Sequence, residues 1–244
     1  MHATLAIVRR ELQAYYGSPL AYVFIVIFLA LAGALTFHVA SWLERGRADL
    51  QPFFQWHPWL YLFLVPAVGM RLWAEERKTG TIEFLMTLPV ATWQAVVGKF
   101  VAAWLFIGSA LALTFPIWIT VNYLGTPDNG VIVAAYLGSW LIAGGMLAVS
   151  AAVSALTRNQ VIAFVLAAAI CFVFMMSGLE IVQSPFRGWA PAALADAIAG
   201  ISLLSAFQQI SQGVIDLRHA ILFTSLIGLS LFVNTAIVEL KKGS

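Results

Sequence analysis

Charge is the scarcest property of this 244-residue sequence, because only 10% of its residues are Asp, Glu, Lys or Arg. Soluble domains carry about 25% charged residues, so the composition excludes an ordinary soluble protein. Hydrophobic residues make up 61% of the chain, and the mean hydropathy is +0.91. These values predict a protein that crosses a membrane several times.

Cysteine is almost absent, since Cys171 is the only one. A single cysteine excludes an intrachain disulfide and a cysteine metal site. The sequence also lacks a phosphate-binding GxxxxGK loop and a Rossmann glycine pattern, so we expect no ATP binding by this chain. Without HExxH or a Ser/His/Asp constellation, we expect no catalysis. The net charge of +2, with no basic stripe, gives no indication of nucleic-acid binding.

The N-terminus does not read as a cleavable signal peptide. Its apolar run, Pro19–Ala40, is longer than the roughly 7–15 residues of a signal-peptide core. Residues 1–18 mix charged and apolar positions, which predicts an amphipathic helix along the membrane surface or, equally, an ordinary juxtamembrane anchor. The chain is expected to turn into the membrane at Gly17-Ser18-Pro19.

Six apolar stretches are long enough for membrane spans, given the roughly 20 helical residues that a bilayer core requires. The fold class is therefore all-α, a polytopic membrane protein with one domain over residues 1–244. Pro116 predicts a kink in the third stretch. Small residues at four-residue spacing (Gly144, Ala148 and Ala152; Gly108 and Ala112) predict close helix packing. The expected spans are about 19–41, 57–74, 96–122, 131–156, 160–182 and 219–239.

Six spans place both termini on the same side of the membrane. Lys and Arg number nine on that side and four on the other. The positive-inside rule therefore predicts that both termini and the loop Arg71–Lys99 are cytoplasmic.

The loop Arg71–Lys99 is the most polar stretch, with seven charges between strongly apolar neighbours. Residues 80–89 predict a short amphipathic helix, in which Ile82, Leu85 and Met86 share one face and Glu83 lies opposite. Such a helix rests on lipid headgroups or docks in a groove of a partner protein, and periodicity alone does not choose between the two.

Other candidate sites are weaker. His38, His57 and His219 all fall near the outer boundary, but their spacing does not indicate a metal site. Met175 and Met176 are potential Cu(I) ligands or apolar filler, and Glu180 is an intramembrane carboxylate or an interfacial one. The outward segment 183–219 predicts a short helix with a face of Leu194, Ile198, Ile201 and Leu204, followed by a turn near Gly213.

The polar loop resembles the cytoplasmic loop of ABC-2 type transporter permeases. The matching positions are Glu76-Arg77, Gly80-Thr81, Glu83, Leu85, Pro89 and Gly98-Lys99. Arg10-Glu11 near the N-terminus and Gly213–Asp216 before the last span also fit this family. Leu124-Gly125, Pro127-Asp128 and Tyr136–Gly138 resemble the small permeases of the gliding-motility and nitrous oxide reductase maturation types.

The resemblance implies a permease subunit of a bacterial ABC transporter in the inner membrane, working as a dimer and coupled to a separate ATPase that binds ATP and Mg²⁺. It implies that the first cytoplasmic loop holds the coupling helix. The ATPase-coupling residues would be Glu76, Arg77, Gly80, Thr81, Ile82, Glu83, Leu85, Met86 and Pro89. The alternative is a membrane scaffold or mechanical assembly factor that acts on periplasmic partners without transport. A secondary transporter is disfavoured because no internal repeat is visible.

Overall fold

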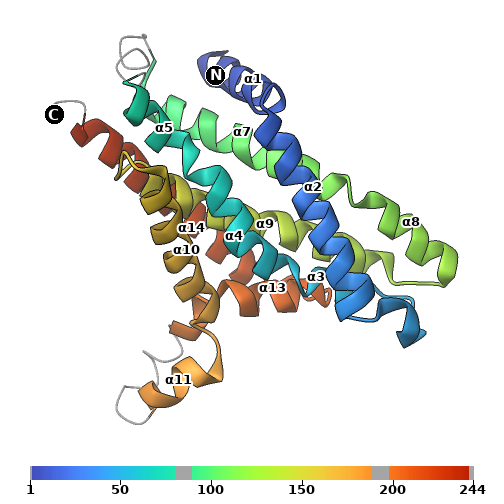
Figure 1. The fold of residues 1–244 in the computed structure, drawn as a ribbon. Helices are drawn as coiled ribbons and strands as arrows, with labels where there is room; N and C mark the ends of the chain where they lie inside the picture. Colours follow the sequence, from blue (N-terminus) through green and yellow to red (C-terminus); the bar gives the residue numbers. More distant parts are fainter. Residues whose placement is uncertain (1, 81–89, 188–197, 242–244) are drawn as a thin grey trace.

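The computed structural model describes residues 2–80, 90–187 and 198–241, and every regular element in these ranges is a helix (Figure 1). The predicted all-helical class is therefore confirmed for this part of the chain. In chain order the helices are α1 (His2–Tyr16), α2 (Pro19–Ala34), η1 (Leu35–Val39), η2 (Trp42–Arg45), α3 (Gln51–Phe54), α4 (His57–Gly69), α5 (Arg71–Thr79), α7 (Thr92–Ala112), α8 (Phe115–Leu124), α9 (Asn129–Ser154), α10 (Gln160–Met176), α11 (Glu180–Arg187), α13 (Leu203–Ser211) and α14 (Leu217–Leu240).

Helix α9 is the centre of the bundle, with α4, α7, α10, α13 and α14 packed around it (Figure 1). Every residue from Ile142 to Ser154 on α9 is buried. Residues of small volume permit this close packing, since a Cβ at Gly138 would lie 2.7 Å from Ile210 and one at Gly145 would lie 3.2 Å from Leu226. The predicted small-residue positions on α9 are all buried, but so are their neighbours on every side.

Trp104 on α7 and Trp140 on α9 pack against each other and join the two helices. The rings of Trp104 and Trp140 stack with centroids 4.3 Å apart, and each indole N–H donates to the other residue's carbonyl oxygen, at 2.9 and 3.3 Å. Trp104 lies against Gly144, and Trp140 lies against Gly108, where an added Cβ would come within 2.7 and 2.8 Å of the indole. The two glycines therefore provide the space that the two rings occupy.

In the part of the chain that the structure describes, four helical stretches are long and apolar enough to cross a membrane: Pro19–Val39, Thr92–Leu124, Asn129–Ser154 and Leu217–Leu240. They correspond to the first, third, fourth and sixth predicted spans. The other two predicted spans fall on shorter helices, since α10 has 17 residues and α4 has 13. The count of six spans depends on α4 and α10, and it stays a prediction.

The kink predicted at Pro116 is confirmed. Helix α7 ends at Ala112, and α8 begins at Phe115 with proline in its first turn. Proline has no N–H for the carbonyl four residues earlier, so the helical ladder is interrupted there. Thr114 offsets part of this loss, because its hydroxyl donates to the Leu111 carbonyl at 2.6 Å.

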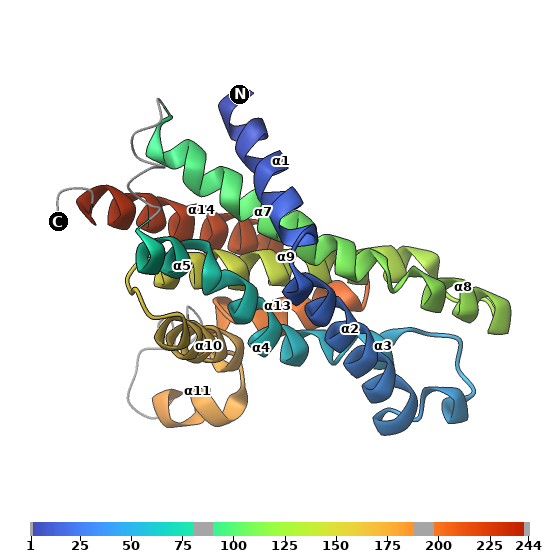
Figure 2. The ribbon, with the colours of Figure 1, turned by 45° about the horizontal axis from the view of Figure 1, so that its top comes forward.

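The predicted N-terminal helix and turn are also present. Helix α1 ends at Tyr16, and α2 begins at Pro19 with Ser18 in extended conformation before it. Helix α1 packs beside α7 (Figures 1 and 2): Tyr15 stacks on Phe106 at 5.0 Å, and the Tyr16 hydroxyl donates to Ser109 Oγ at 2.6 Å. The N-terminal helix is thus fixed to the bundle through its side chains.

The start of α1 and the end of α14 lie at the same end of the bundle as the end of α5 and the start of α7, while α11 lies toward the opposite end (Figure 1). Between α11 and α14, α13 packs on α9 and α10 and buries Leu204. The predicted single face is wrong in this part, because Ile198 and Ile201 precede α13 and Ile201 lies exposed in a turn. The predicted turn at Gly213 is present, with φ of +87°. Leu194 lies outside the described residues.

Candidate functional site

The candidate site is built around α5, which starts at a break in the helix that precedes it. Helix α4 ends at Gly69, and α5 begins at Arg71. The hydroxyl of Ser154, at the end of α9, bridges this break. It accepts hydrogen bonds from the N–H groups of Trp73 and Ala74, at 3.1 and 3.0 Å, and it donates to the Met70 carbonyl at 2.7 Å. A hydroxyl with one proton and two lone pairs is fully used by these three bonds.

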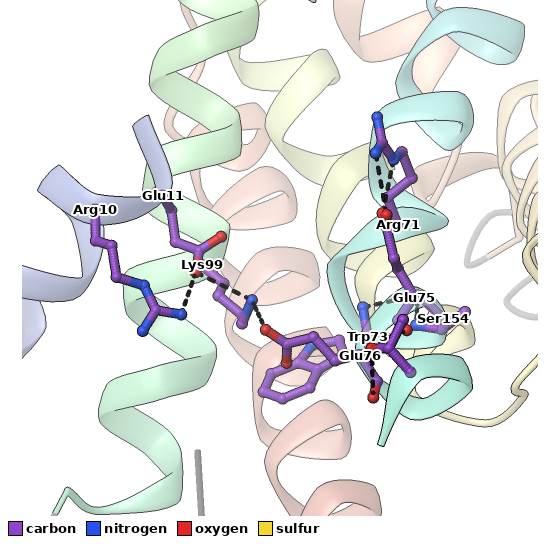
Figure 3. Close-up of polar contacts among 10 residues, drawn as sticks. Arg10, Glu11, Arg71, Trp73, Glu75, Glu76, Lys99 and Ser154 are labelled. Carbon is purple, nitrogen blue, oxygen red and sulfur yellow. Dashed lines mark hydrogen bonds and ion pairs between the residues drawn. The ribbon is translucent and has the colours of Figure 1, made fainter. Parts of the chain in front are cut away.

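Lys99 ties α5 to two other helices. Its ammonium group lies 2.6 Å from Glu76 Oε1 on α5 and 3.3 Å from Glu11 Oε1 on α1 (Figure 3). Only 3% of the Lys99 side chain is exposed, and its charge also lies over the Trp73 ring, 5.6 Å from the centroid. A buried ammonium is tolerated when it is paired in this way, so α1, α5 and α7 meet at this residue.

Gly98 explains how Glu11 reaches Lys99. A Cβ at position 98 would lie 2.8 Å from Cγ2 of Ile7 on α1, so only glycine allows α1 to approach α7 this closely. The Gly98-Lys99 pair therefore has two roles, because the glycine admits α1 and the lysine binds its carboxylate. We refer to Trp73, Glu76, Lys99 and Ser154 as the α5 anchor.

The exposed side of α5 carries a second ion pair. The Arg71 guanidinium donates to Glu75 one turn later, through Nε at 2.8 Å and Nη2 at 3.2 Å (Figure 3). Pairs at this spacing stabilise a helix by about 0.2–0.5 kcal/mol, so Arg71 and Glu75 support α5 without fixing its place in the bundle.

Helix α5 ends at Thr79, and Gly80 follows in the left-handed conformation with φ of +74°. Glycine adopts this conformation without a steric penalty, so Gly80 is a favourable end for α5.

Three cations gather beside the end of α5. Nε of Arg77 is buried without an acceptor among the described residues, and burial together with the nearby Arg158 lowers the pKa of Arg77. Lys241 donates to the Leu156 carbonyl at 2.6 Å, and its pKa is lowered by burial and then by the charges of Arg77 and Arg158. This end of the bundle therefore favours an anionic neighbour.

The structure places only part of the predicted coupling set. Glu76 lies in the α5 anchor, Arg77 lies in the cation cluster and Gly80 caps the helix. The predicted helix over 80–89 falls on residues outside the described ranges. The positions concerned are Thr81, Ile82, Glu83, Leu85, Met86 and Pro89.

The weaker candidates lie apart from this site. His57 is buried with Nδ1 2.7 Å from Ser139 Oγ, whereas His38 is exposed. Within the described ranges no three His, Cys, Asp or Glu side chains are placed to hold a metal ion. Met175 is buried in the core, and Glu180 opens α11 beyond the end of α10.

Three important residues were missed from the sequence: Glu11 as the partner of Lys99, Trp73 and Ser154. A signal for Glu11 was available in Lys99, an isolated lysine seven residues into an apolar helix. A buried lysine requires a carboxylate nearby. Ser154 gave no signal, because its partners lie about 80 positions earlier in the chain.

The family described as ABC-2 family transporter protein matches residues 60–238, which is most of the chain. The chain belongs to this family. The match runs from α4 to α14 and includes α5, its anchor residues and the predicted coupling segment. With its apolar helices, this permease is an integral membrane protein of the ABC transporter class. No curated protein matches the chain.

Proposed function

We propose that this chain is the membrane permease subunit of an ABC transporter whose ATP hydrolysis occurs in a separate nucleotide-binding subunit. Membership of the ABC-2 family supports this reading, because such permeases generally pair with an ABC ATP-binding subunit. ATP and Mg²⁺ would be bound by that partner, and the permease would act without catalysis. The narrower branch that we propose is the gliding-motility and nitrous oxide reductase maturation type, with two permease copies in the complex.

The observation that carries the mechanism is the rigid attachment of α5. This helix directly precedes the proposed coupling segment, residues 80–89, and the α5 anchor joins it to α1, α7 and α9. Displacement of the segment by a docked ATPase would therefore move α5 together with the helices that hold it. A switch of this kind needs two packed arrangements that the partner stabilises to different degrees.

Glu83→Lys and Leu85→Asp are expected to weaken binding of the ATPase subunit. The first replaces an attraction at the rim of a docking groove with a repulsion, and the second places a charge in the apolar contact, so the second should be worse. Glu83→Gln should weaken binding less than Glu83→Lys.

The measurement is co-purification of the partner ATPase subunit with each permease variant, with the membrane level of each variant as control. Full ATPase binding and full stimulation of hydrolysis in both Glu83→Lys and Leu85→Asp would show that residues 80–89 do not couple the permease to the ATPase. On a lipid-surface reading, Glu83→Lys would be neutral or favourable, because a lysine is attracted to anionic lipid.

The proposed orientation places both termini and Lys78 in the cytoplasm and Arg45 outside. In a Cys171→Ala background, Lys78→Cys should react with a membrane-impermeant maleimide only after the cells are opened, while Arg45→Cys should react in intact cells. Both positions are exposed in the structure, so accessibility depends on the side of the membrane. Labelling of Arg45→Cys only in opened cells would refute the proposed topology.

A further inference from the structure

A cavity of about 510 Å³ lies between α1 and α2 on one side and α4, α5 and α7 on the other. Its volume is within the range of small-molecule binding sites, about 300–1,000 Å³. The α5 anchor forms only part of the cavity wall, through Glu76 and Lys99.

The wall of this cavity is amphipathic. Its apolar part includes Val23, Phe24 and Ile27 of α2 and Leu64 and Val68 of α4. Its polar end is formed by α1 and α5 and includes Arg10, Tyr15 and Arg71.

The polar end carries three cations and three carboxylates, and some of its donor groups have no acceptor within the described residues. Its carboxylates are already engaged, since Glu75 pairs with Arg71, and both Glu11 and Glu76 pair with Lys99. Arg10 makes a single 3.4 Å contact to Glu11, and Arg71 Nη1 and the Tyr15 hydroxyl have no hydrogen-bond acceptor among the described residues. An anionic group with several acceptor oxygens is the chemistry that these donors recognise.

The cavity also extends along α2 over about two thirds of the depth of one leaflet. Its polar end lies beside Ser18, immediately before the candidate span Pro19–Val39. Ile27 lies seven residues beyond Leu20, which is about 10 Å along a helix, and half of a hydrocarbon core is about 15 Å. The charged end is therefore at headgroup level and the apolar end at the level of acyl chains.

We propose that this cavity binds one glycerophospholipid from the leaflet on the side of the termini, with the lipid phosphate at Arg10 and Arg71 and one acyl chain along α2 and α4. The bound lipid would fill the gap between the N-terminal hairpin α1–α2 and the rest of the bundle. The proposal depends on the family being membrane-spanning, and it does not depend on docking of an ATPase at residues 80–89.

Two pairs of variants test the site on the full chain purified in mild detergent. Val23→Trp fills the apolar part of the cavity, and its control is Val26→Trp, an exposed valine on the same helix that does not line the cavity. Arg10→Gln removes a phosphate donor, and its control is Arg9→Gln, which lies outside the cavity.

Native mass spectrometry would measure binding of dioleoyl phosphatidylglycerol and of dioleoylglycerol, which has the same chains without the phosphate. We expect one phosphatidylglycerol per chain in the original protein and weaker binding of dioleoylglycerol. Arg10→Gln should lower phosphatidylglycerol affinity about tenfold, as expected for a lost charge-assisted hydrogen bond, and leave dioleoylglycerol binding unchanged. Val23→Trp should reduce binding of both lipids, and the two controls should bind like the original protein.

Three results would overturn the proposal. Equal binding in Val23→Trp and Val26→Trp would show that lipid does not use this cavity. Equal affinity for the two lipids in the original protein would show that the cavity does not recognise the lipid phosphate. Dissociation of a dimer by Val23→Trp, with lipid stoichiometry unchanged, would mean that a second copy of the chain covers the cavity.

Discussion

Lys99→Met is expected to destabilise this permease by about 3 kcal/mol and to release α1 from α7. The substitution keeps the length of the side chain but leaves Glu11 and Glu76 facing each other without the ammonium group that lies between them (Figure 3). Breaking a buried ion pair by removing one partner is costly because the remaining charges stay poorly solvated. The measurements are the apparent melting temperature in detergent and the rate of tryptic cleavage after Arg9 and Arg10.

Two comparisons make this result specific to the ion pairs. Lys78→Met removes a lysine from the exposed end of α5 and should change the melting temperature little. The triple variant Lys99→Met, Glu11→Gln and Glu76→Gln has no unpaired charge in the anchor and should recover at least half of the lost stability. A Lys99→Met protein as stable as Lys78→Met would show that Lys99 does not hold the three helices together.

Ser154→Ala is expected to free the start of α5. The change leaves two N–H groups, of Trp73 and Ala74, and the Met70 carbonyl without their partner. A buried polar group without a partner costs about 1–3 kcal/mol, less where α5 shifts to reach water. Hydrogen exchange of the Trp73 and Ala74 amides should therefore accelerate, and the melting temperature should fall.

Ser150→Ala is the matched control, one helical turn earlier on the same face of α9. Its hydroxyl donates to the Met146 carbonyl within its own helix, at 2.7 Å, so its removal leaves no group on α5 unpaired. If the α5 amides exchange no faster in Ser154→Ala than in Ser150→Ala, the hydroxyl does not position α5.

The features predicted correctly from the sequence are those that depend on neighbours in the chain. Pro116 interrupts a helix because of its own missing N–H. The four long apolar stretches became helices for the same local reason. Lys99 was recognised as part of a motif, but the sequence did not predict that Glu11 and Glu76 are its ion-pair partners.

The features that the sequence did not reveal depend on contacts between distant segments. The apolar stretch over residues 57–74 is continuous in sequence, yet the helix breaks at Met70, where a serine from α9 caps the next helix. Nothing near Ser154 distinguishes it from other serines in apolar surroundings. Likewise, the cavity arises only when α1 and α2 pack against α4, and no single segment carries its pattern.

The packing of Trp104 against Gly144 and of Trp140 against Gly108 limits which substitutions these four positions accept during evolution. Each indole occupies the volume that a side chain at the facing glycine would need, so a larger residue at Gly144 requires a smaller one at Trp104, and the same holds for Gly108 and Trp140. The positions are therefore linked across the two helices as two pairs, and each pair can mutate only in concert. Homologous sequences should show tryptophan with glycine, or a smaller residue with a larger one, at each pair.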